Sequence, residues 1–299
     1  MTFAIAIATR EAVMVAADRR LSGTARVAGH AATKVCRIGT ANSHGIMTYA
    51  GAGARVSAQP FEISTWLERL LRGHIGDHNA TMQEIEKAAN EQCLAKLGPN
   101  HAFAFAGFMD GKPLIDILMS EKLTPEIEKE KEARGTDFWR FRTMVPPGKN
   151  GFCTIGTGNA SFKRDRLAHR AAKYLKRSSR VPAYRDRAAA LMSMIVRNIS
   201  QQHADVSPEC VCCWTDTQKT GQIWIFDAHG QRMENGEPVP IVDRGWDVSE
   251  MSKHIGPLTE KWVAQALEAR LAGRPIPEID REAMQAALAK IDLTPKRKF

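Results

Sequence analysis

Alternation of bulky and small apolar residues at the start of the chain predicts a β-hairpin. The alternation runs through residues 3–8, which is the period-two pattern of a strand buried on both faces. Polar Arg10 and Glu11 interrupt it, and it resumes from Val13 to Asp18. We therefore expect two antiparallel strands, with residue 18 returning to lie beside the beginning of the first strand.

Strand and helix patterns continue through residue 227. Asp110 and Gly111 form a favoured two-residue turn between two apolar runs and predict a second hairpin. Gly98 and Pro99 end the helical pattern before it. The predicted strands are 34–38, 45–50, 101–109, 113–119, 152–155, 210–215 and 222–227, and the predicted helices are 56–72, 81–97, 159–175 and 185–201. This order of elements indicates the α+β class.

Two segments depart from this pattern. Residues 121–150 are interpreted as an insertion that carries one charged helix. After the last predicted strand the composition shifts toward Pro and Gly. We expect a connector to about Pro257, an amphipathic helix that begins at Leu258 and is ended by Gly273, and a last helix capped by Asp280. We therefore divide the chain into a main domain, 1–228, and a C-terminal extension with two helices, 229–299.

Composition narrows the class of protein. The 299 residues are 43% hydrophobic and carry a formal net charge of +9, which excludes a disordered chain. The longest apolar stretch, residues 2–9, is far shorter than the roughly 20 residues of a spanning helix and has no basic segment before it. We expect a cytoplasmic protein with no membrane partner. Basic residues concentrate at 163–187, but without accompanying aromatic residues or a known binding module we expect no nucleic-acid partner.

Cysteine and histidine spacing gives no metal site. The three cysteines at 210, 212 and 213 do not match the paired C-x-x-C spacing of a zinc site, so we expect free thiols. His74 and His78 have a helical i, i+4 spacing, but Gly73 and Gly76 interrupt the helix. We interpret these histidines as a solvated helix end, and we expect neither a metal nor a cofactor.

Thr2 is the first candidate for chemistry. Removal of Met1 would leave threonine as a free N-terminus, whose α-amine has an ordinary pKa near 7.7–8.0 and can act as a base for the threonine hydroxyl. Asp18 and Lys34 complete the group, because the hairpin and the third strand bring them toward residue 2. A lysine ammonium beside the α-amine favours its neutral form, and a carboxylate holds the lysine charged.

The string Ala16-Ala17-Asp18-Arg19-Arg20 and the offsets of Asp18 and Lys34 from Thr2 resemble proteasome β-subunits and related bacterial threonine peptidases, which are N-terminal-nucleophile hydrolases. The resemblance covers roughly residues 2–227, apart from the insertion at 121–150. It implies a four-layer αββα sandwich of two antiparallel sheets between helical layers. It also implies that Thr2 is the nucleophile, that Lys34 tunes its amine and that Asp18 holds Lys34.

Further positions follow from the same resemblance. Gly51 corresponds to the glycine whose N–H forms the oxyanion hole, although the loop before it is about three residues longer than usual. Thr157, between Gly156 and Gly158, takes the place of a serine that supports the amine. A phosphate-binding turn is the competing reading of this segment. The residues implied to line the substrate pocket are Leu21, Ser22, Ala32, Cys36, Tyr49 and Gly53.

A late loop completes the predicted site. The family has an aspartate and a serine three residues apart before a late strand, whereas this chain has Asp205 and Ser207, two apart. Either residue could orient the amine, and the sequence leaves both open.

The resemblance implies a threonine endopeptidase that acts on peptides or unfolded proteins inside a homo-oligomeric ring, and it leaves open whether an ATP-dependent unfoldase delivers the substrate. Three alternatives remain. They are a catalytically silent ring scaffold, an amidase of the same family that acts on a small molecule, and a nucleotide-binding α/β protein.

Overall fold

The computed structural model describes most of the chain. The described residues are 3–20, 32–51, 63–92, 94–97, 101–157, 166–178, 180–233 and 239–295. Within these ranges, no helix is both long enough and apolar enough to cross a membrane.

The first sheet has six strands, and the N-terminal hairpin lies within it. Its order is β11-β10-β9-β2-β1-β8. Strands β1 and β2 pair antiparallel with Ala4 opposite Ala17, which confirms the predicted hairpin. The strands are β1 (Phe3–Ala8), β2 (Ala12–Asp18), β8 (Gly151–Gly156), β9 (Cys210–Asp216), β10 (Gly221–Phe226) and β11 (Arg232–Met233). Every residue of β1 and β2 is buried, as the alternation of apolar residues predicted.

The second sheet has seven strands in the order β13-β12-β3-β4-β5-β6-β7. Asp110 and Gly111 both have positive φ, as the predicted tight turn between β5 and β6 requires. The strands are β3 (Val35–Gly39), β4 (Ser43–Ala50), β5 (Ala102–Met109), β6 (Lys112–Met119), β7 (Trp139–Met144), β12 (Ile241–Asp243) and β13 (Trp246–Asp247). All of these pairings are antiparallel except that of β12 with β3.

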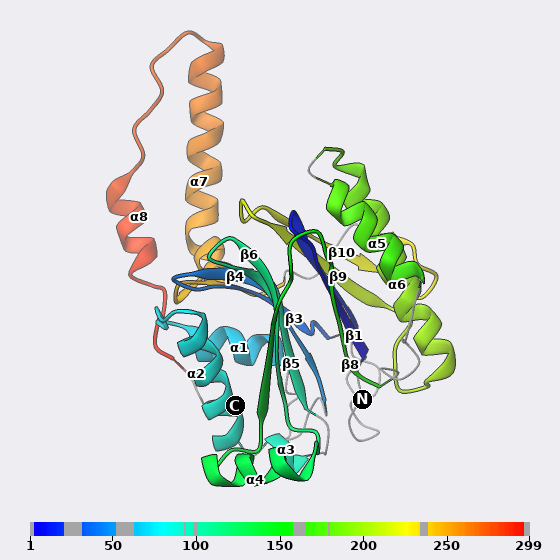
Figure 1. The fold of residues 1–299 in the computed structure, drawn as a ribbon. Helices are drawn as coiled ribbons and strands as arrows, with labels where there is room; N and C mark the ends of the chain where they lie inside the picture. The colour runs from blue at the N-terminus through cyan, green and yellow to red at the C-terminus, as the bar shows by residue number, and fades with distance from the viewer. Residues whose placement is uncertain are drawn as a thin grey trace.

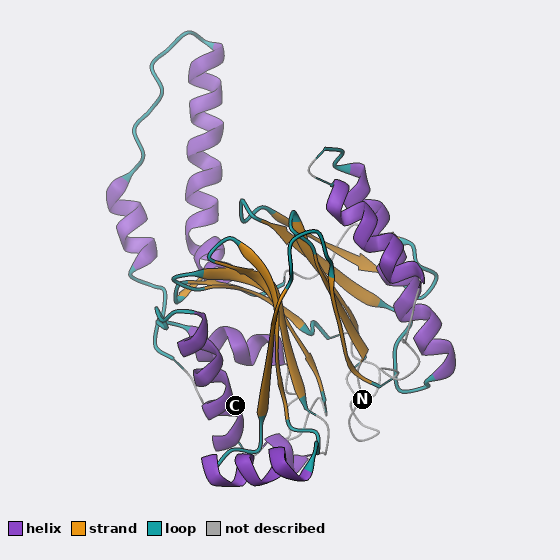
Figure 2. Ribbon diagram, viewed as in Figure 1, coloured by secondary structure: helices purple, strands orange, loops and turns teal. Residues whose placement is uncertain are grey.

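Helices lie on the outer sides of the two sheets, which face each other (Figures 1 and 2). One apolar core fills the space between the sheets, with Val15 from β2 and Ile46 from β4 among its members. A second core lies between the six-stranded sheet and helices α5 and α6, and a third between the seven-stranded sheet and helices α1 and α2. The helices are α1 (Ile63–Leu71), α2 (His78–Glu91), α3 (Leu94–Leu97), α4 (Pro125–Arg134), α5 (Arg166–Arg177), α6 (Ala183–Gln202), α7 (Val248–Leu271) and α8 (Arg281–Leu288).

The segments that departed from the sequence pattern contain more regular structure than expected. The 121–150 segment contains the predicted helix α4, but it also contributes β7, which pairs with β6 at the sheet edge. The expected connector after residue 228 contributes β11, β12 and β13. Helix α7 starts at Val248, ten residues before the predicted start, because Pro257 lies inside the helix and does not begin it. The side chain of Asp247 caps α7 by accepting a hydrogen bond from Glu250 N at 2.8 Å.

Helices α7 and α8 extend away from the sheets as an arm (Figure 1). Only Ala269 of α7 is buried, whereas Val263, Leu267 and Leu271 are half or more exposed. The indole of Trp262 joins the two halves of the arm by donating to Pro277 O at 2.8 Å. The arm is therefore held mainly at its base, where Arg72 contacts Asp247 at 2.6 Å.

Candidate active site

Asp18 and Lys34 meet in a buried ion pair between the two sheets. Asp18 is the last residue of β2, and Lys34 directly precedes β3. Lys34 Nζ lies 3.0 Å from Asp18 Oδ1, and both side chains are almost completely inaccessible to solvent. The sequence predicted that the hairpin and a nearby third strand bring these residues to the same end. The structure brings them together, although β3 lies in the second sheet and does not pair with the hairpin.

Three backbone N–H groups also donate to the Asp18 carboxylate. Phe3 N donates to Oδ1 at 2.9 Å. Arg20 N and Ser207 N donate to Oδ2 at 3.0 and 3.3 Å. These donors explain how a carboxylate can be buried at the end of a strand, because each of its oxygens has partners. Since Phe3 N and Lys34 Nζ contact the same oxygen, they lie within about 6 Å of each other.

Strand β4 fixes the backbone of Lys34. The Lys34 carbonyl accepts hydrogen bonds from Thr48 Oγ1 at 3.0 Å and from Tyr49 N at 3.3 Å. Burial lowers the pKa of the Lys34 ammonium, and the adjacent Asp18 carboxylate opposes that shift. Lys34 therefore lies in a rigid position where its protonation state responds to neighbouring charges.

Thr157 and Asp205 form a second contact in this region. Thr157 follows β8 and donates from Oγ1 to Asp205 Oδ2 at 2.9 Å. The Asp205 carboxylate also raises the pKa of Lys34, which places its charge within electrostatic range of the ion pair. Ser207 contributes differently, because its backbone N–H binds Asp18 while its hydroxyl accepts from Glu209 N at 3.2 Å. We call Asp18, Lys34, Thr157 and Asp205 the Asp18 centre.

Several predicted site residues lie outside the described residues. They are Thr2, Leu21, Ser22 and Gly53. The other predicted pocket residues, Ala32, Cys36 and Tyr49, are all buried. Ala32 N donates to Arg19 O at 2.8 Å, which returns the chain to the end of β2 before Lys34.

Gly51 directly follows β4 and packs against a histidine that the sequence did not single out. A Cβ at Gly51 would lie 2.6 Å from His101 Nδ1 and closer still to the Tyr49 hydroxyl, so only glycine fits there. The Tyr49 hydroxyl and His101 Nδ1 form a short hydrogen bond. Burial lowers the pKa of His101 to about 4, so the ring is neutral at pH 7. A single histidine before a strand gave no pattern that could have predicted this contact.

No protein-family model matches the chain, and neither does any curated protein. Its fold is similar to that of solved Anbu proteins. An Anbu (Gly-1) mutant from Hyphomicrobium sp. strain MC1 has 14% identity and a TM-score of 0.46, with 76% of this chain and 89% of that chain covered. Anbu, described as an ancestral β-subunit, from Yersinia bercovieri has 11% identity and a TM-score of 0.44, with 74% and 86% covered. The helical assembly of the Anbu complex from Pseudomonas aeruginosa has 11% identity and a TM-score of 0.45, with 92% and 98% covered. The site assignment rests on the geometry described above.

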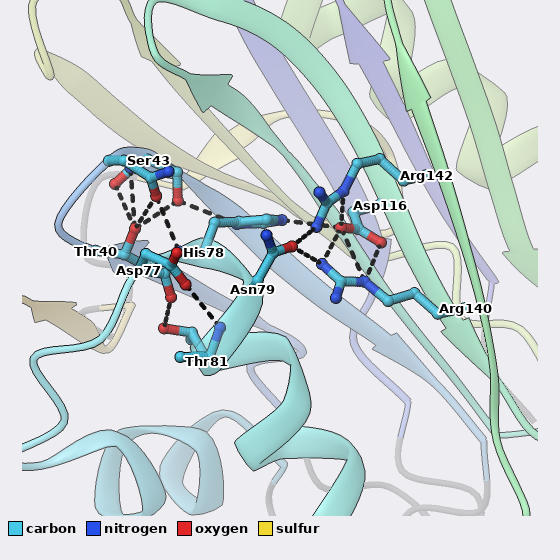
Figure 3. Close-up of polar contacts among 11 residues, drawn as sticks. Thr40, Ser43, Asp77, His78, Asn79, Thr81, Asp116, Arg140 and Arg142 are labelled. Atoms are coloured by element: carbon cyan, nitrogen blue, oxygen red, sulfur yellow. Dashed lines mark hydrogen bonds and ion pairs between the residues drawn. The ribbon is translucent and has the colours of Figure 1, made fainter. Parts of the chain in front are cut away.

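A second buried polar group surrounds Asp116 on β6 (Figure 3). His78 Nε2 contacts Asp116 Oδ2 at 2.9 Å, and Ser43 Oγ contacts His78 Nδ1 at 3.1 Å. Arg140 and Arg142 on β7 contact the same carboxylate oxygen at 2.6 and 2.8 Å. We call these five residues the Asp116 cluster. His78 is therefore buried, and the interpretation of it as a solvated helix end was wrong, because a carboxylate on a distant strand binds its ring.

The Asp116 cluster has the residue types of a serine hydrolase, but its atoms are not available for that reaction. Ser43 is 4% exposed and His78 is 1% exposed, so a substrate carbonyl has no access to the hydroxyl. Thr40 Oγ1 also contacts Ser43 Oγ, at 2.8 Å. Burial acts to raise the pKa of Asp116, but the hydrogen bonds from His78 and Arg140 outweigh it and hold that pKa below its usual range.

The possible metal ligands and the cysteines of the described residues bear on metal binding and thiol catalysis. No group of three or more His, Cys, Asp or Glu side chains gathers there in a way that could hold a metal ion. The described cysteines are free and buried. Burial raises the pKa of the Cys153 and Cys213 thiols to about 12, which leaves almost no thiolate at neutral pH.

Proposed function

We propose that this protein is a threonine-type endopeptidase whose nucleophile is Thr2 as a mature N-terminal residue. The observation that carries the proposal is the contact of Lys34 Nζ and Phe3 N with one buried oxygen of Asp18. Phe3 N belongs to the peptide bond that joins Thr2 to the rest of the chain. A free α-amine on Thr2 would therefore begin one residue from an ion pair whose lysine can tune it.

The proposed reaction is acyl transfer to threonine followed by hydrolysis. Thr2 Oγ attacks the carbonyl carbon of a peptide bond while the α-amine takes the hydroxyl proton and later gives it to the leaving amine. The Gly51 N–H donates to the developing oxyanion. Water then attacks the acyl-threonine ester, releases the second product and restores the hydroxyl.

Neighbouring groups have supporting roles in this proposal. Lys34 favours the neutral form of the α-amine, and Asp18 holds Lys34. The Thr157 hydroxyl, bound to Asp205, directly follows β8, the strand that pairs with β1, and in this proposal it orients the amine. The backbone N–H of Ser207 supports Asp18.

Architecture and assembly belong to the same proposal. The helix–sheet–sheet–helix order supports a four-layer αββα sandwich over residues 1–228, with 229–299 as an extension. The apolar substrate pocket that the resemblance implies remains part of the proposal, although Tyr49 and Cys36 are buried in the described structure. We propose that the chain forms a homo-oligomeric ring that admits unfolded polypeptides, with an unfoldase as a further partner to be tested.

Intact-mass spectrometry tests the proposed nucleophile. We expect the purified protein to lack Met1 and to gain one adduct when treated with a peptide epoxyketone, a reagent that requires both the hydroxyl and the free amine of N-terminal threonine. The Thr2→Ala variant should lose Met1 and gain no adduct. A Ser43→Ala variant is the matched control and should be labelled like the wild type.

The same experiment separates the alternatives. Retained Met1 with no adduct would contradict the peptidase and favour a silent ring scaffold. An adduct without hydrolysis of any peptide or unfolded protein would favour an amidase that acts on a small molecule.

A further inference from the structure

The positive charge of the chain is concentrated on helices α5 and α6. Residues 166–202 contain nine Lys and Arg residues and one acidic residue, Asp186, and so carry a formal charge of +8, against +9 for the whole chain. Two of these arginines serve internal contacts: Arg185 binds Asp216 at 3.3 Å, and Arg197 donates to His229 O at 2.6 Å. The seven others are exposed, and they are Arg166, Arg170, Lys173, Lys176, Arg177, Arg180 and Arg187.

Helix α5 presents a continuous basic line to solvent. Its buried residues, Ala168, Ala171, Ala172 and Leu175, pack on the six-stranded sheet. At 3.6 residues per turn, Arg166, Arg170, Lys173 and Arg177 fall on the opposite side of the helix, and all four are exposed. At 1.5 Å per residue this line is about 16 Å long. Helices α5 and α6 form an outer layer of the molecule, away from the arm (Figure 1).

Two tyrosines at the junction of α5 and α6 hold arginines beside this line. The Tyr174 and Tyr184 rings lie 5.5 Å apart. The Arg170 guanidinium lies 5.9 Å from the Tyr174 ring, and Arg187 lies 5.9 Å from Tyr174 and 5.7 Å from Tyr184. These distances are at the outer limit of a cation–π contact, so the two rings keep Arg170 and Arg187 close together at the surface. Both tyrosines remain partly exposed, so they can also contact a base.

We propose that the exposed face of α5 and α6 binds a nucleic-acid strand through its phosphate backbone. Arginine predominates among the exposed basic residues, and its planar fork matches phosphate oxygens. α5 exposes no apolar residue fully, and on the α6 side of the face the exposed large apolar residues are Val181 and Met194, each 40% exposed. Charged side chains therefore predominate on this face, unlike the core of a protein interface or the apolar side of a membrane-bound helix. Two copies of this face repel each other, so a symmetric contact of the face with itself is unfavourable. The sequence predicted no nucleic-acid partner because neither accompanying aromatic residues nor a known module was evident, whereas the fold places Tyr174 and Tyr184 beside the exposed basic residues.

Fluorescence anisotropy with a labelled 20-nucleotide single strand of mixed sequence tests the proposal. Four phosphate contacts predict that affinity for a single strand falls about 50-fold between 50 and 200 mM KCl. The triple variant Arg166→Glu, Arg170→Glu and Lys173→Glu should bind at least about 30-fold more weakly at 50 mM, with a salt slope smaller by about 2. The corresponding glutamine triple should show a smaller loss in the same direction, and thermal melting verifies that each variant is folded.

The matched control removes the same net charge from the arm. Lys261, Arg281 and Lys290 are exposed on or beside α7 and α8, and their triple glutamate variant should bind like the wild type. Equal loss of binding in the two glutamate triples would overturn the proposal, because net charge alone would then explain it. Absence of binding at 50 mM KCl would overturn it too, as would equal or tighter binding of poly-glutamate or of anionic phospholipid vesicles. Because no outcome depends on Thr2, this test is independent of the proposed peptidase activity.

Discussion

The Asp18 centre and the Asp116 cluster are both buried groups built around one aspartate, but they differ in which atoms surround the carboxylate. Asp18 accepts three backbone N–H bonds and one lysine, whereas Asp116 accepts two arginines and a histidine. An arginine does not lose its proton in proteins, but a buried lysine can. The Asp18 centre therefore contains a buried lysine that can lose its proton, while Arg140 and Arg142 of the Asp116 cluster keep theirs.

The Asp18 centre and the Asp116 cluster also differ in where they lie in the fold. The Asp18 centre lies where β1, β2, β8 and the start of β3 come together, next to the first described residue of the chain. The Asp116 cluster joins α2 to strands β4, β6 and β7 on the outer side of the second sheet (Figure 3). The serine, histidine and aspartate of this cluster are better explained as a structural network than as a catalytic triad. The presence of the residue types does not by itself make an active site.

Replacing Lys34 should have the largest effect on the reaction rate and so distinguish the Asp18 centre most clearly from the Asp116 cluster. Lys34→Met keeps the length of the side chain but removes the charge beside Asp18. We expect peptide hydrolysis or epoxyketone labelling to slow by about 1,000-fold, which is typical of the loss of a group that assists proton transfer. Rates of adduct formation, measured by mass spectrometry, check this. Labelling at the wild-type rate would show that Lys34 has no part in the reaction.

Replacing Asp116 should have the opposite effect. Asp116→Asn leaves Arg140, Arg142 and His78 without their shared carboxylate, and breaking a buried ion pair from one side costs about 3 kcal/mol. We expect urea unfolding to show this loss of stability, with no change in the labelling rate of the folded protein. A slower labelling rate at full stability would mean that the Asp116 cluster is coupled to the reaction.

His101 should make stability depend on pH. Its pKa is about 4 in the folded protein because of burial, against 6.5 ordinarily, so between these values the unfolded chain binds more protons. Stability should therefore fall as pH decreases from 6.5 to 4, by up to about 3 kcal/mol from this residue. Urea unfolding at several pH values should show a smaller decrease for His101→Gln, and an equal decrease in both proteins would disprove the assignment.

Removing one hydroxyl from each region should have the smallest effects. Thr157→Val removes the donor to Asp205 and should slow labelling about tenfold, since a hydrogen bond to a charged group contributes about 1.5 kcal/mol. Ser43→Ala should lower stability by about 1 kcal/mol and leave labelling unchanged. Both variants are assayed by labelling and by urea unfolding. Slower labelling of Ser43→Ala with normal labelling of Thr157→Val would contradict the assignment of the reaction to the Asp18 centre.

Local patterns explain which parts of the fold could be predicted. The alternation in residues 3–8 and the tight turn at Asp110 define hairpins that depend on neighbouring residues only, and both were predicted correctly. Asp18 and Lys34 were also expected to meet, but β3 belongs to the second sheet and does not pair with the hairpin, so their contact joins the two sheets. By contrast, β12 pairs in parallel with β3 across some two hundred residues, and a three-residue strand leaves no detectable periodicity.

Long-range contacts explain the remaining differences. β7 alternates aromatic residues with Arg140 and Arg142, so its sequence does not have the apolar pattern of a strand. The arginines are accommodated there because both bind Asp116, which is distant along the chain. His78 was assigned to solvent from its neighbours along the chain, whereas Asp116 on β6 determines its burial. The start of α7 was misplaced because Pro257 resembles a helix start, although the cap at Asp247 begins the helix. Tyr49 and His101 likewise meet only in the folded chain.

The most direct test of the central claim is the pKa of the Thr2 α-amine, measured by NMR titration of protein that contains ¹⁵N-threonine, with Thr2→Ala to identify the signal. The account predicts a free amine whose pKa lies below the ordinary 7.7–8.0 in the wild type and returns to that range in Lys34→Met. An α-amine pKa that is the same in both proteins, or the absence of a free threonine amine, would contradict it.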